Sequence, residues 1–235
     1  MPPGNSEAIR RMFSEIAPRY DLLNHVLSLD RDRAWRQRAC GMLSVAGGER
    51  VLDVCAGTGD LALALLSHAP SVREVCICDF AEPMLALARG KADGAARGRM
   101  RLVCGDALAL PYADGAFDIV TCAFGVRNFA STEDGLRELH RVTTPGGQLL
   151  LLEFCRPRPA WYRAPADVFI GGVLPRAGAA LSGHPDAYTY LHRSIRAFLS
   201  REELAELLAH VGYRDVRCED LTFGIATAFH GTREP

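Results

Sequence analysis

Two glycines and a distant carboxylate have the spacing of a site for a nucleotide-like ligand. Gly57-Thr58-Gly59 stands between the apolar run 51–54 and the leucine-rich run 61–66, which gives the order strand, turn, helix. Glycines allow a tight turn and a close approach to a ligand, and the following helix offers unpaired N–H groups. Asp79 ends the next apolar run, 20 residues after Gly59. At that offset a carboxylate accepts hydrogen bonds from ribose hydroxyls in Rossmann-type sites.

Two more acids favour a ligand that carries positive charge. Asp53 lies four residues before Gly57, and Asp106 comes just after a third apolar run. Open α/β sheets bind ligands at the carboxyl ends of their strands, where both acids would lie. The cationic groups of S-adenosylmethionine would be attracted there, whereas the pyrophosphate of a dinucleotide would be repelled. Because 57–62 also fits G-x-G-x-x-A, an NAD-dependent oxidoreductase stays an alternative, as does a nucleotide-binding module without catalysis.

Alternating strand and helix patterns predict that one α/β fold positions these residues. We expect a doubly wound, Rossmann-like, seven-stranded and mostly parallel sheet, with one antiparallel strand near the C-terminus. The strands are expected near 50–55, 72–79, 100–104, 117–122, 148–154, 213–220 and 222–230. Ser131, and Ser200 with Glu203, predict capped helices that start at 132 and 201.

Two segments differ from this regular core. Residues 1–48 predict a helical N-terminal cap, and 49–235 predict the ligand-binding core. Inside the core, 155–199 breaks the rhythm with many prolines, glycines and aromatic residues, which predicts an inserted lid or an apolar substrate pocket. In the cap, the basic run that includes Arg33 and Arg36 predicts a solvated face, with contact to an anionic membrane surface as the alternative.

Composition argues against several function classes. Among 235 residues, 27 Lys and Arg against 28 Asp and Glu leave a net charge of −1, which argues against a nucleic-acid partner. No apolar run approaches the roughly 18 residues that span a bilayer, and the N-terminus lacks a signal-peptide core, so we expect a cytoplasmic protein. The eight cysteines form no C-x-x-C pair, which predicts reduced, buried thiols and no metal site.

Several segments together resemble one enzyme family. They are 13–24, 51–61, 124–128, 145–154 and 186–191, and the resemblance runs from about residue 12 to 232. These segments resemble the C-methyltransferases of menaquinone and ubiquinone biosynthesis, which are class I S-adenosylmethionine-dependent methyltransferases. The resemblance implies S-adenosylmethionine as co-substrate, with contacts at Thr58, Asp79, Asp106 and Ala107.

The same resemblance implies methylation of a ring carbon of a polyprenyl quinol. We expect demethylmenaquinol as the acceptor, with the methoxybenzoquinol of ubiquinone biosynthesis as the alternative. In the binding hypothesis, Gly57, Thr58 and Gly59 hold the amino-acid end of the cofactor, Asp79 the ribose, and 106–107 the adenine edge. An unrelated small molecule or a macromolecule remains a second class of acceptor.

Carbon methylation of a quinol needs groups that take or steer a proton. Arg127 is the candidate to stabilise a phenolate, and Asn128 the candidate to orient a hydroxyl. Tyr20, Tyr190 and His25 are further candidates. The quinol would reach the site from a membrane, so we expect its isoprenoid tail to lie against the lid and the protein to contact the inner face of the membrane peripherally.

The chain departs from the family pattern at a few positions. Ala123 stands where the family often has Ser, His192-Arg193 replaces a Pro-x pair, and Cys155 replaces Ser. Three of these changes fall in the predicted lid, while the predicted cofactor site is intact. The sequence leaves the ring type, the tail length and a homodimer open.

Overall fold

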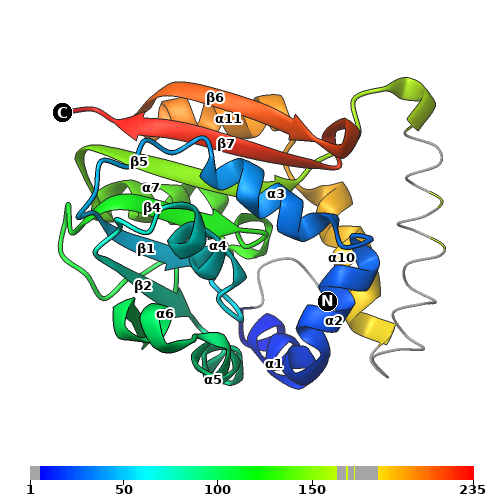
Figure 1. Cartoon of the computed structure of the whole chain (residues 1–235). Helices are drawn as coiled ribbons and strands as arrows, with labels where there is room; N and C mark the ends of the chain where they lie inside the picture. The colour runs from blue at the N-terminus through cyan, green and yellow to red at the C-terminus, as the bar shows by residue number, and fades with distance from the viewer. Residues whose placement is uncertain (1–5, 163–167, 169–171, 173–184) are drawn as a thin grey trace.

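The sheet has seven strands in the order β3-β2-β1-β4-β5-β7-β6. The structure is a computed structural model that describes residues 6–162, 168, 172 and 185–235. The strands are β1 (Arg50–Val54), β2 (Glu74–Asp79), β3 (Met100–Cys104), β4 (Phe117–Ala123), β5 (Thr143–Phe154), β6 (Tyr213–Leu221) and β7 (Ala226–Arg233). Only β7 runs antiparallel to its neighbours β5 and β6, so the predicted mostly parallel sheet with one antiparallel strand is confirmed (Figure 1).

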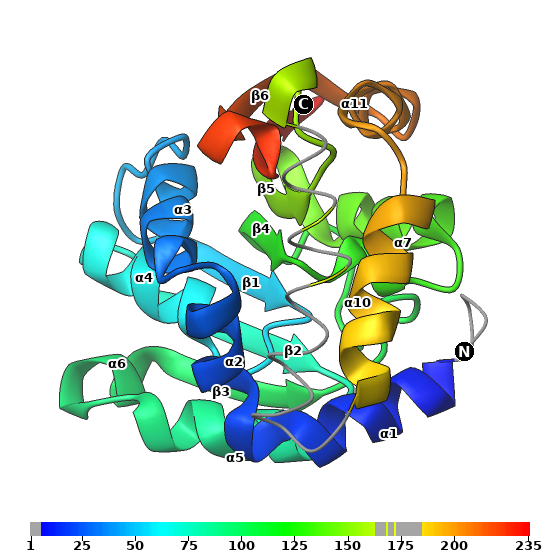
Figure 2. The ribbon, with the colours of Figure 1, turned by 90° about the vertical axis from the view of Figure 1, so that its right-hand side faces the viewer.

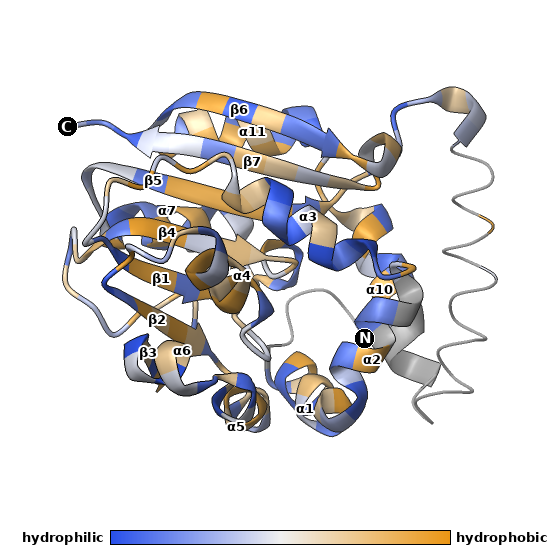
Figure 3. Cartoon of the chain, viewed as in Figure 1, coloured by the Kyte–Doolittle hydropathy of each residue, from blue (hydrophilic) through white to orange (hydrophobic). Residues whose placement is uncertain are grey.

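Helices cover both faces of the sheet because successive residues of each strand point to opposite sides. In β5, Leu150 and Leu152 join the core under α3 (Arg31–Cys40), α4 (Asp60–His68) and α5 (Glu82–Lys91). Leu149 and Leu151 join the core under α7 (Thr132–Val142) and α11 (Arg201–His210). Both faces of the inner strands are therefore buried, which explains their unbroken apolar runs, visible as orange strands in Figure 3.

Both predicted helix caps form. The Ser131 hydroxyl accepts the Asp134 N–H at the start of α7. Ser200 and Glu203 make a reciprocal capping box at the start of α11. These local signals depend on residues three apart in the chain, so the sequence alone was sufficient to predict them.

The first helices lie across the carboxyl edge of the sheet (Figure 2). They are α1 (Ser6–Ile16), the short η1 (Ala17–Arg19) and α2 (Tyr20–Leu27). Ile9, Met12 and Ile16 of α1 share a buried cluster with Met84 of α5 and Tyr190 of α10 (Pro185–Ala197). These contacts fasten α1 to the core, and they place Tyr20 above the glycine turn.

The third helix differs from the first two because it packs on the sheet. Trp35 and Ala39 of α3 belong to the same buried cluster as the strands. The side chain of Arg36 is only 7% exposed, so the prediction of a solvated basic face is wrong at this position. The short helix η2 (Val126–Asn128) follows β4 at the carboxyl edge, whereas α6 (Gly94–Arg99) leads into the start of β3 at the opposite edge.

Part of the predicted lid, namely 163–167, 169–171 and 173–184, lies outside the described residues. Its described parts are 155–162, residues 168 and 172, and the segment from α10 to 199. Among the helices of the described residues, none combines the length and the apolar character that crossing a bilayer requires.

Candidate active site

The main cavity opens where β1, β2 and β4 end. With the open solvent at its mouth included, it spans about 710 Å³, and its walls are the turns after these strands, the turn after β3, and the cap residues Phe13 and Tyr20. Of the residues proposed from sequence, it brings together Tyr20, Gly57, Asp79, Asp106, Ala107 and Asn128. Residues from five separate segments therefore meet at the edge where open α/β sheets bind ligands.

Asp79 closes the floor of this main cavity. Its Oδ2 accepts the Gly57 N–H and its Oδ1 accepts the Ala81 N–H, each at 2.8 Å. A carboxylate can accept about four hydrogen bonds, so each oxygen keeps a lone pair for a ligand hydroxyl. Burial raises the pKa of Asp79, while these backbone N–H groups act in the opposite direction and favour the ionised form.

The two glycines of the turn have different tasks. Gly57 has a φ of 55°, and a Cβ there would lie 3.7 Å from the Tyr20 ring. Gly59 has a φ of 80°, and a Cβ there would meet the Cβ of Ala88 in α5 at 3.2 Å. Gly57 lines the cavity, whereas Gly59 lets α4 pack against α5 and is not among the lining residues.

Asp106 and Ala107 form the far wall, beyond the end of β3. Asp106 is exposed, and its Oδ1 accepts the Leu108 N–H at 2.9 Å. Ala107 is buried beneath it. The wall therefore offers an apolar surface beside one solvated carboxylate.

A second chamber, which spans about 330 Å³ with open solvent included, adjoins the first at Tyr20. The two share Tyr20, Cys55, Gly57, Ala123 and Phe124 as wall residues. The second chamber adds Arg36 and Asp53, which carry opposite charges and are both buried. One connected space thus has a zwitterionic end and an apolar end.

Asp53 is the least satisfied acid of the site. It is 1% exposed, and its Oδ1 accepts the Thr121 hydroxyl at 2.8 Å. Its Oδ2 has no hydrogen-bond partner among the residues that the structure describes. Burial raises the pKa of Asp53 to about 7, against the opposing effects of Thr121 and of the Arg36 charge. A buried oxygen with a free lone pair is suited to a ligand cation.

Thr58 connects the turn to the cap. Its hydroxyl donates to Asp21 Oδ1 at 2.5 Å and accepts from Lys91 Nζ at 2.8 Å. Lys91 also lies 2.6 Å from Asp21 Oδ2 and 2.6 Å from Asp60 Oδ1. The Thr58 side chain therefore has protein partners on both sides, although the residue lines the second chamber.

A buried ion pair fixes the side chain of Arg127, which belongs to η2. Its Nη1 lies 2.6 Å from Oε1 of the fully buried Glu153 and also contacts the Phe124 carbonyl. The guanidinium lies over the Phe154 ring, 5.3 Å from its centroid. Its Nε has no hydrogen-bond partner among the described residues. Arg127 is not among the wall residues of the main cavity, so it acts on that space through its charge.

Asn128 and Tyr20 form the polar part of the cavity roof, and Tyr190 contacts Asn128 from outside the cavity wall. The Tyr190 hydroxyl donates to Asn128 Oδ1 at 2.9 Å, and Asn128 Nδ2 lies 3.4 Å from the Phe124 carbonyl. Burial raises the pKa of both Tyr20 and Tyr190, whereas the Arg127 charge lowers both. Both phenols are therefore neutral donors at physiological pH.

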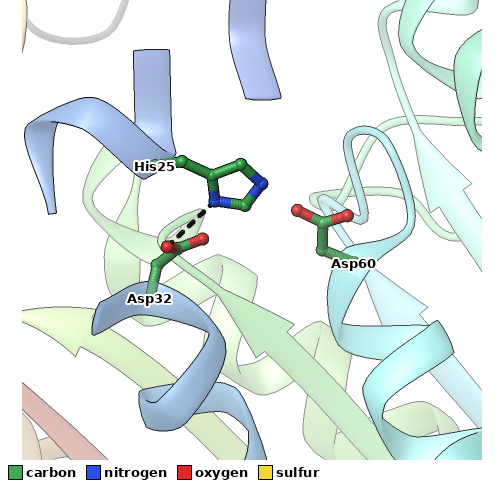
Figure 4. A group of neighbouring side chains, drawn as sticks. All are labelled: His25, Asp32 and Asp60. Carbon is green, nitrogen blue, oxygen red and sulfur yellow. Dashed lines mark hydrogen bonds and ion pairs between the residues drawn. The ribbon is translucent and has the colours of Figure 1, made fainter. Parts of the chain in front are cut away.

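His25, Asp32 and Asp60 place potential ligand atoms within 4.8 Å of one another (Figure 4). His25 Nδ1 lies 3.0 Å from Asp32 Oδ1. Arg36 already pairs with Asp32 and lies 3.6 Å from Asp60, which in turn pairs with Lys91. Because each carboxylate has a cationic partner, the group is an ion network that joins α2, α3 and α4.

With this geometry established, comparison with known proteins is informative. A family model described as the ubiE/COQ5 methyltransferase family matches residues 2–233. The chain belongs to this family. Two relatives named demethylmenaquinone methyltransferase are each 50% identical. The Deinococcus radiodurans protein aligns over 97% of this chain and 93% of its own length, and the Thermus thermophilus protein over 94% and 100%.

Solved structures add support for the fold of this ubiE/COQ5 family member. A S-adenosylmethionine-dependent methyltransferase from Thermotoga maritima is 17% identical, with a TM-score of 0.66, covering 95% of this chain and 99% of its own. The [4+2]-cyclase SpnF is also 17% identical, with a TM-score of 0.70, covering 97% and 96%. One fold thus serves different reactions, so the function must be argued from the site.

Sequence reasoning missed three charged residues of this family member's site, namely Arg36, Lys91 and Glu153. Glu153 ends the apolar run 149–152, and an acid so placed needs a buried cation. That signal was available, but the identity of its partner was not. Arg36 and Lys91 sit on helices whose exposed and buried faces are decided only when the elements pack.

Proposed function

We propose that this chain transfers the methyl group of S-adenosylmethionine to a ring carbon of demethylmenaquinol. The observation that carries the proposal is the connected space with a zwitterionic end at Arg36 and Asp53 and an apolar end at Ala107. The co-substrate has a zwitterionic amino-acid end and an aromatic base at the other, joined by a ribose. The 50% identity to two proteins named demethylmenaquinone methyltransferase supports the choice of acceptor.

The residues present fit S-adenosylmethionine. The unpartnered Oδ2 of Asp53 is placed to accept from the α-ammonium, and Arg36 is placed to bind the α-carboxylate. The free lone pairs of Asp79 would accept the ribose hydroxyls, and 106–107 would flank the adenine. Gly57 allows close approach, and Thr58 contributes its backbone because its hydroxyl already has two partners. When bound, the sulfonium supplies an electrophilic methyl group.

The roof residues would orient the quinol. Asn128 has an amide N–H left to donate to a ring oxygen, since Tyr190 occupies its Oδ1. Tyr20, a neutral phenol on the cavity wall, would donate to the second oxygen. Neither tyrosine is a base at neutral pH, so their role is to steer the ring so that one carbon faces the methyl group.

Arg127 would act on the developing quinolate. Its charge lowers the pKa of both neighbouring tyrosines, and the same field would lower the pKa of a quinol hydroxyl in the cavity. Because Arg127 is not among the cavity wall residues, this effect would act through its charge. Glu153 fixes the guanidinium in place, which makes Glu153 a positioning residue.

A second acceptor has a specific observation in its favour. A relative from Geobacter sulfurreducens, 43% identical over 97% of this chain and 89% of its own length, is named ubiquinone/menaquinone biosynthesis C-methyltransferase UbiE. The methoxybenzoquinol of ubiquinone biosynthesis is therefore the second candidate. For either acceptor we propose peripheral contact with the inner face of the membrane, where a polyprenyl tail resides.

The test is methyl transfer to matched acceptors. The purified protein receives S-adenosylmethionine with a demethylmenaquinol, a polyprenyl methoxybenzoquinol or a catechol, each kept reduced in detergent, and mass spectrometry records one added methyl. We expect methylation of the demethylmenaquinol at carbon. Methylation of the catechol alone would replace carbon transfer by oxygen transfer. Cofactor binding without any transfer would contradict the proposal.

A further inference from the structure

Three aromatic rings form an exposed patch beside the β6–β7 connection. They are Trp161, Tyr162 and Phe223, called the aromatic patch below. Their ring centroids lie 5.0–5.6 Å apart in all three pairs. Trp161 is 69% exposed and Phe223 is 55% exposed. Large aromatic side chains gathered at the surface indicate an interaction site more often than isolated ones do.

The fold holds the aromatic patch in place by backbone contacts. The Arg158 N–H donates to the Phe223 carbonyl at 3.0 Å, and the Cys155 N–H donates to the Ile225 carbonyl at 2.9 Å. These bonds fasten 155–158 to η4 (Thr222–Gly224). Trp35 of α3 donates from Nε1 to the Thr222 hydroxyl at 2.8 Å. Phe223 and the segment that leads to Trp161 are therefore anchored to the core of the fold.

Phe223 is exposed at the expense of backbone strain. Its φ is 59° and that of Thr222 is 45°, in the left-handed region that is unfavourable for a non-glycine residue. Asn tolerates this region better than Phe and would be as well solvated. A strained conformation that presents a large apolar ring to solvent motivates a functional explanation.

Positive charge lies beside the aromatic patch. One hollow beside it is lined by Arg156, Arg158, Arg196 and Arg201, with Glu202 and Asp220 as its acids. Asp220 pairs with Arg158 and Arg201. Four cations against two anions leave a local excess of two, although the whole chain has a net charge of −1. The charge complements an anionic surface.

The aromatic patch lies on the same edge of the sheet as the main cavity. β5 and β6 run in the same direction, and the patch follows the carboxyl ends of both (Figure 1). Phe154, the last residue of β5, stacks on Phe124 of the cavity wall with centroids 4.5 Å apart. Trp35 in turn contacts Phe154, with centroids 6.2 Å apart. Aromatic contacts thus extend from the cavity wall toward the patch.

We propose that the aromatic patch docks on an anionic lipid bilayer, with Trp161 and Phe223 at headgroup depth and the hollow's arginines facing lipid phosphates. The amphipathic rings of Trp and Tyr favour that depth. The inference rests on the proposed function only in that a polyprenyl acceptor resides in the bilayer. Docking turns the carboxyl edge of the sheet, and with it the cavity, toward the membrane.

Tryptophan fluorescence tests the proposal directly, because the chain has two tryptophans and Trp35 is only 5% exposed. The full chain is mixed with vesicles of phosphatidylcholine containing phosphatidylglycerol, with or without brominated lipid. We expect Trp161 emission to shift to the blue and to be quenched by the bromines. Unquenched emission would overturn the proposal, as would a shift that depends on protein concentration alone, which would indicate a second copy.

Variants separate docking from folding. We expect F223N and W161S each to weaken partition to these vesicles about tenfold, because partition follows the apolar area buried in the interface. F223N relieves backbone strain, so its thermal stability should not fall. Leu87→Gln removes an exposed apolar side chain from α5, away from the patch, and should bind like the wild type. Equal partition of all four proteins would overturn the proposal.

The two proposals fail separately. A short-tailed, water-soluble demethylated quinol should be methylated equally by wild type and F223N without vesicles, while vesicle-borne quinol should be methylated more slowly by F223N. If no quinol is methylated, the proposed function fails, yet vesicle partition still decides the docking surface. If F223N loses activity on the soluble quinol as well, the aromatic patch belongs to the active site and docking is overturned.

Discussion

The ends of β1 and β2 lie side by side, and each carries an aspartate in a different state. Asp79 has a backbone N–H on each carboxylate oxygen. Asp53 has one hydroxyl on one oxygen and no hydrogen bond from described residues on the other. Burial raises the pKa of both, and that of Asp53 reaches about 7. The backbone thus supports the charge of Asp79, whereas Asp53 needs a cation from outside.

Among the residues of the site, Asp79 should cause the largest loss of S-adenosylmethionine affinity when it is replaced. In D79N the side-chain nitrogen must face either the Gly57 or the Ala81 N–H, so two donors meet. Losing a charge-assisted hydrogen bond costs about 1.5–3 kcal/mol, so we expect S-adenosylmethionine to bind about 100-fold more weakly. Calorimetry gives the dissociation constant. D106N, at an exposed carboxylate, is the control and should lose about tenfold or less; equal losses would contradict the distinction.

Arg36 should show an effect that depends on the ligand. R36M removes the partner of the α-carboxylate, so we expect S-adenosylhomocysteine to bind about 30-fold more weakly. 5′-Methylthioadenosine, which lacks the amino-acid end, should bind as it does to the wild type. The double variant R36M/D32N tests the same point without leaving Asp32 unpaired, and R33M is an exposed control. Equal weakening of both ligands would refute the assignment.

Asp53 should make cofactor affinity depend on pH. Its ionised form binds the ammonium, so affinity should rise about tenfold from pH 6 to pH 8, as a group with a pKa of about 7 ionises. D53N should bind more weakly and lose this pH dependence. Titration calorimetry at three pH values measures the dissociation constant of each protein. A wild-type affinity that is constant over this range would contradict the ammonium contact.

The same carboxyl predicts a trend in stability. Its pKa is raised from 3.8 to about 7 on folding, so the folded state binds a proton more tightly than the unfolded state. This stabilisation is complete below about pH 4 and is lost as the pH rises through about 7. The free energy of unfolding, measured with denaturant at pH 5 and pH 8, should therefore fall more between these pH values in the wild type than in D53N.

Thr58 should give the smallest effect on binding. T58V removes the hydroxyl that joins Asp21 to Lys91, which costs about 1 kcal/mol of folding stability. Because the hydroxyl faces the cap, we expect the dissociation constant of S-adenosylmethionine to change less than threefold. Thermal unfolding and calorimetry measure the two quantities. A large loss of S-adenosylmethionine affinity with unchanged stability would contradict this expectation and would indicate that the hydroxyl contacts the ligand.

The sequence was sufficient for features that depend on local order. Strand, turn and helix follow one another around Gly57, and helix capping at Ser131 and Ser200 depends on near neighbours. Asp79 and Asp106 could be placed in one site because parallel strands end at one edge of the sheet. The resemblance to a family added Asn128 and Tyr20, which line the same cavity.

The sequence could not predict which charged residues, far apart in the chain, would become neighbours in the fold. Arg36 lies on α3 and Asp53 lies on β1, and nothing in the sequence of α3 marks Arg36 as buried. Glu153 lies 26 residues from Arg127, and Lys91 lies 31 from Asp60. Such pairs form only when helices settle on the sheet, so their roles followed from geometry.

Lys91 carries a consequence for turnover. One ammonium group holds Asp21 of the cap, Asp60 of α4 and the Thr58 hydroxyl, and the adjacent Tyr20 covers the nucleotide turn. We infer that Tyr20 moves when spent cofactor leaves, which would break these partly solvated ionic contacts. Salt weakens contacts of this kind. We therefore expect the rate of cofactor exchange to rise with ionic strength. In this view the contacts of Lys91 limit how fast the cofactor leaves.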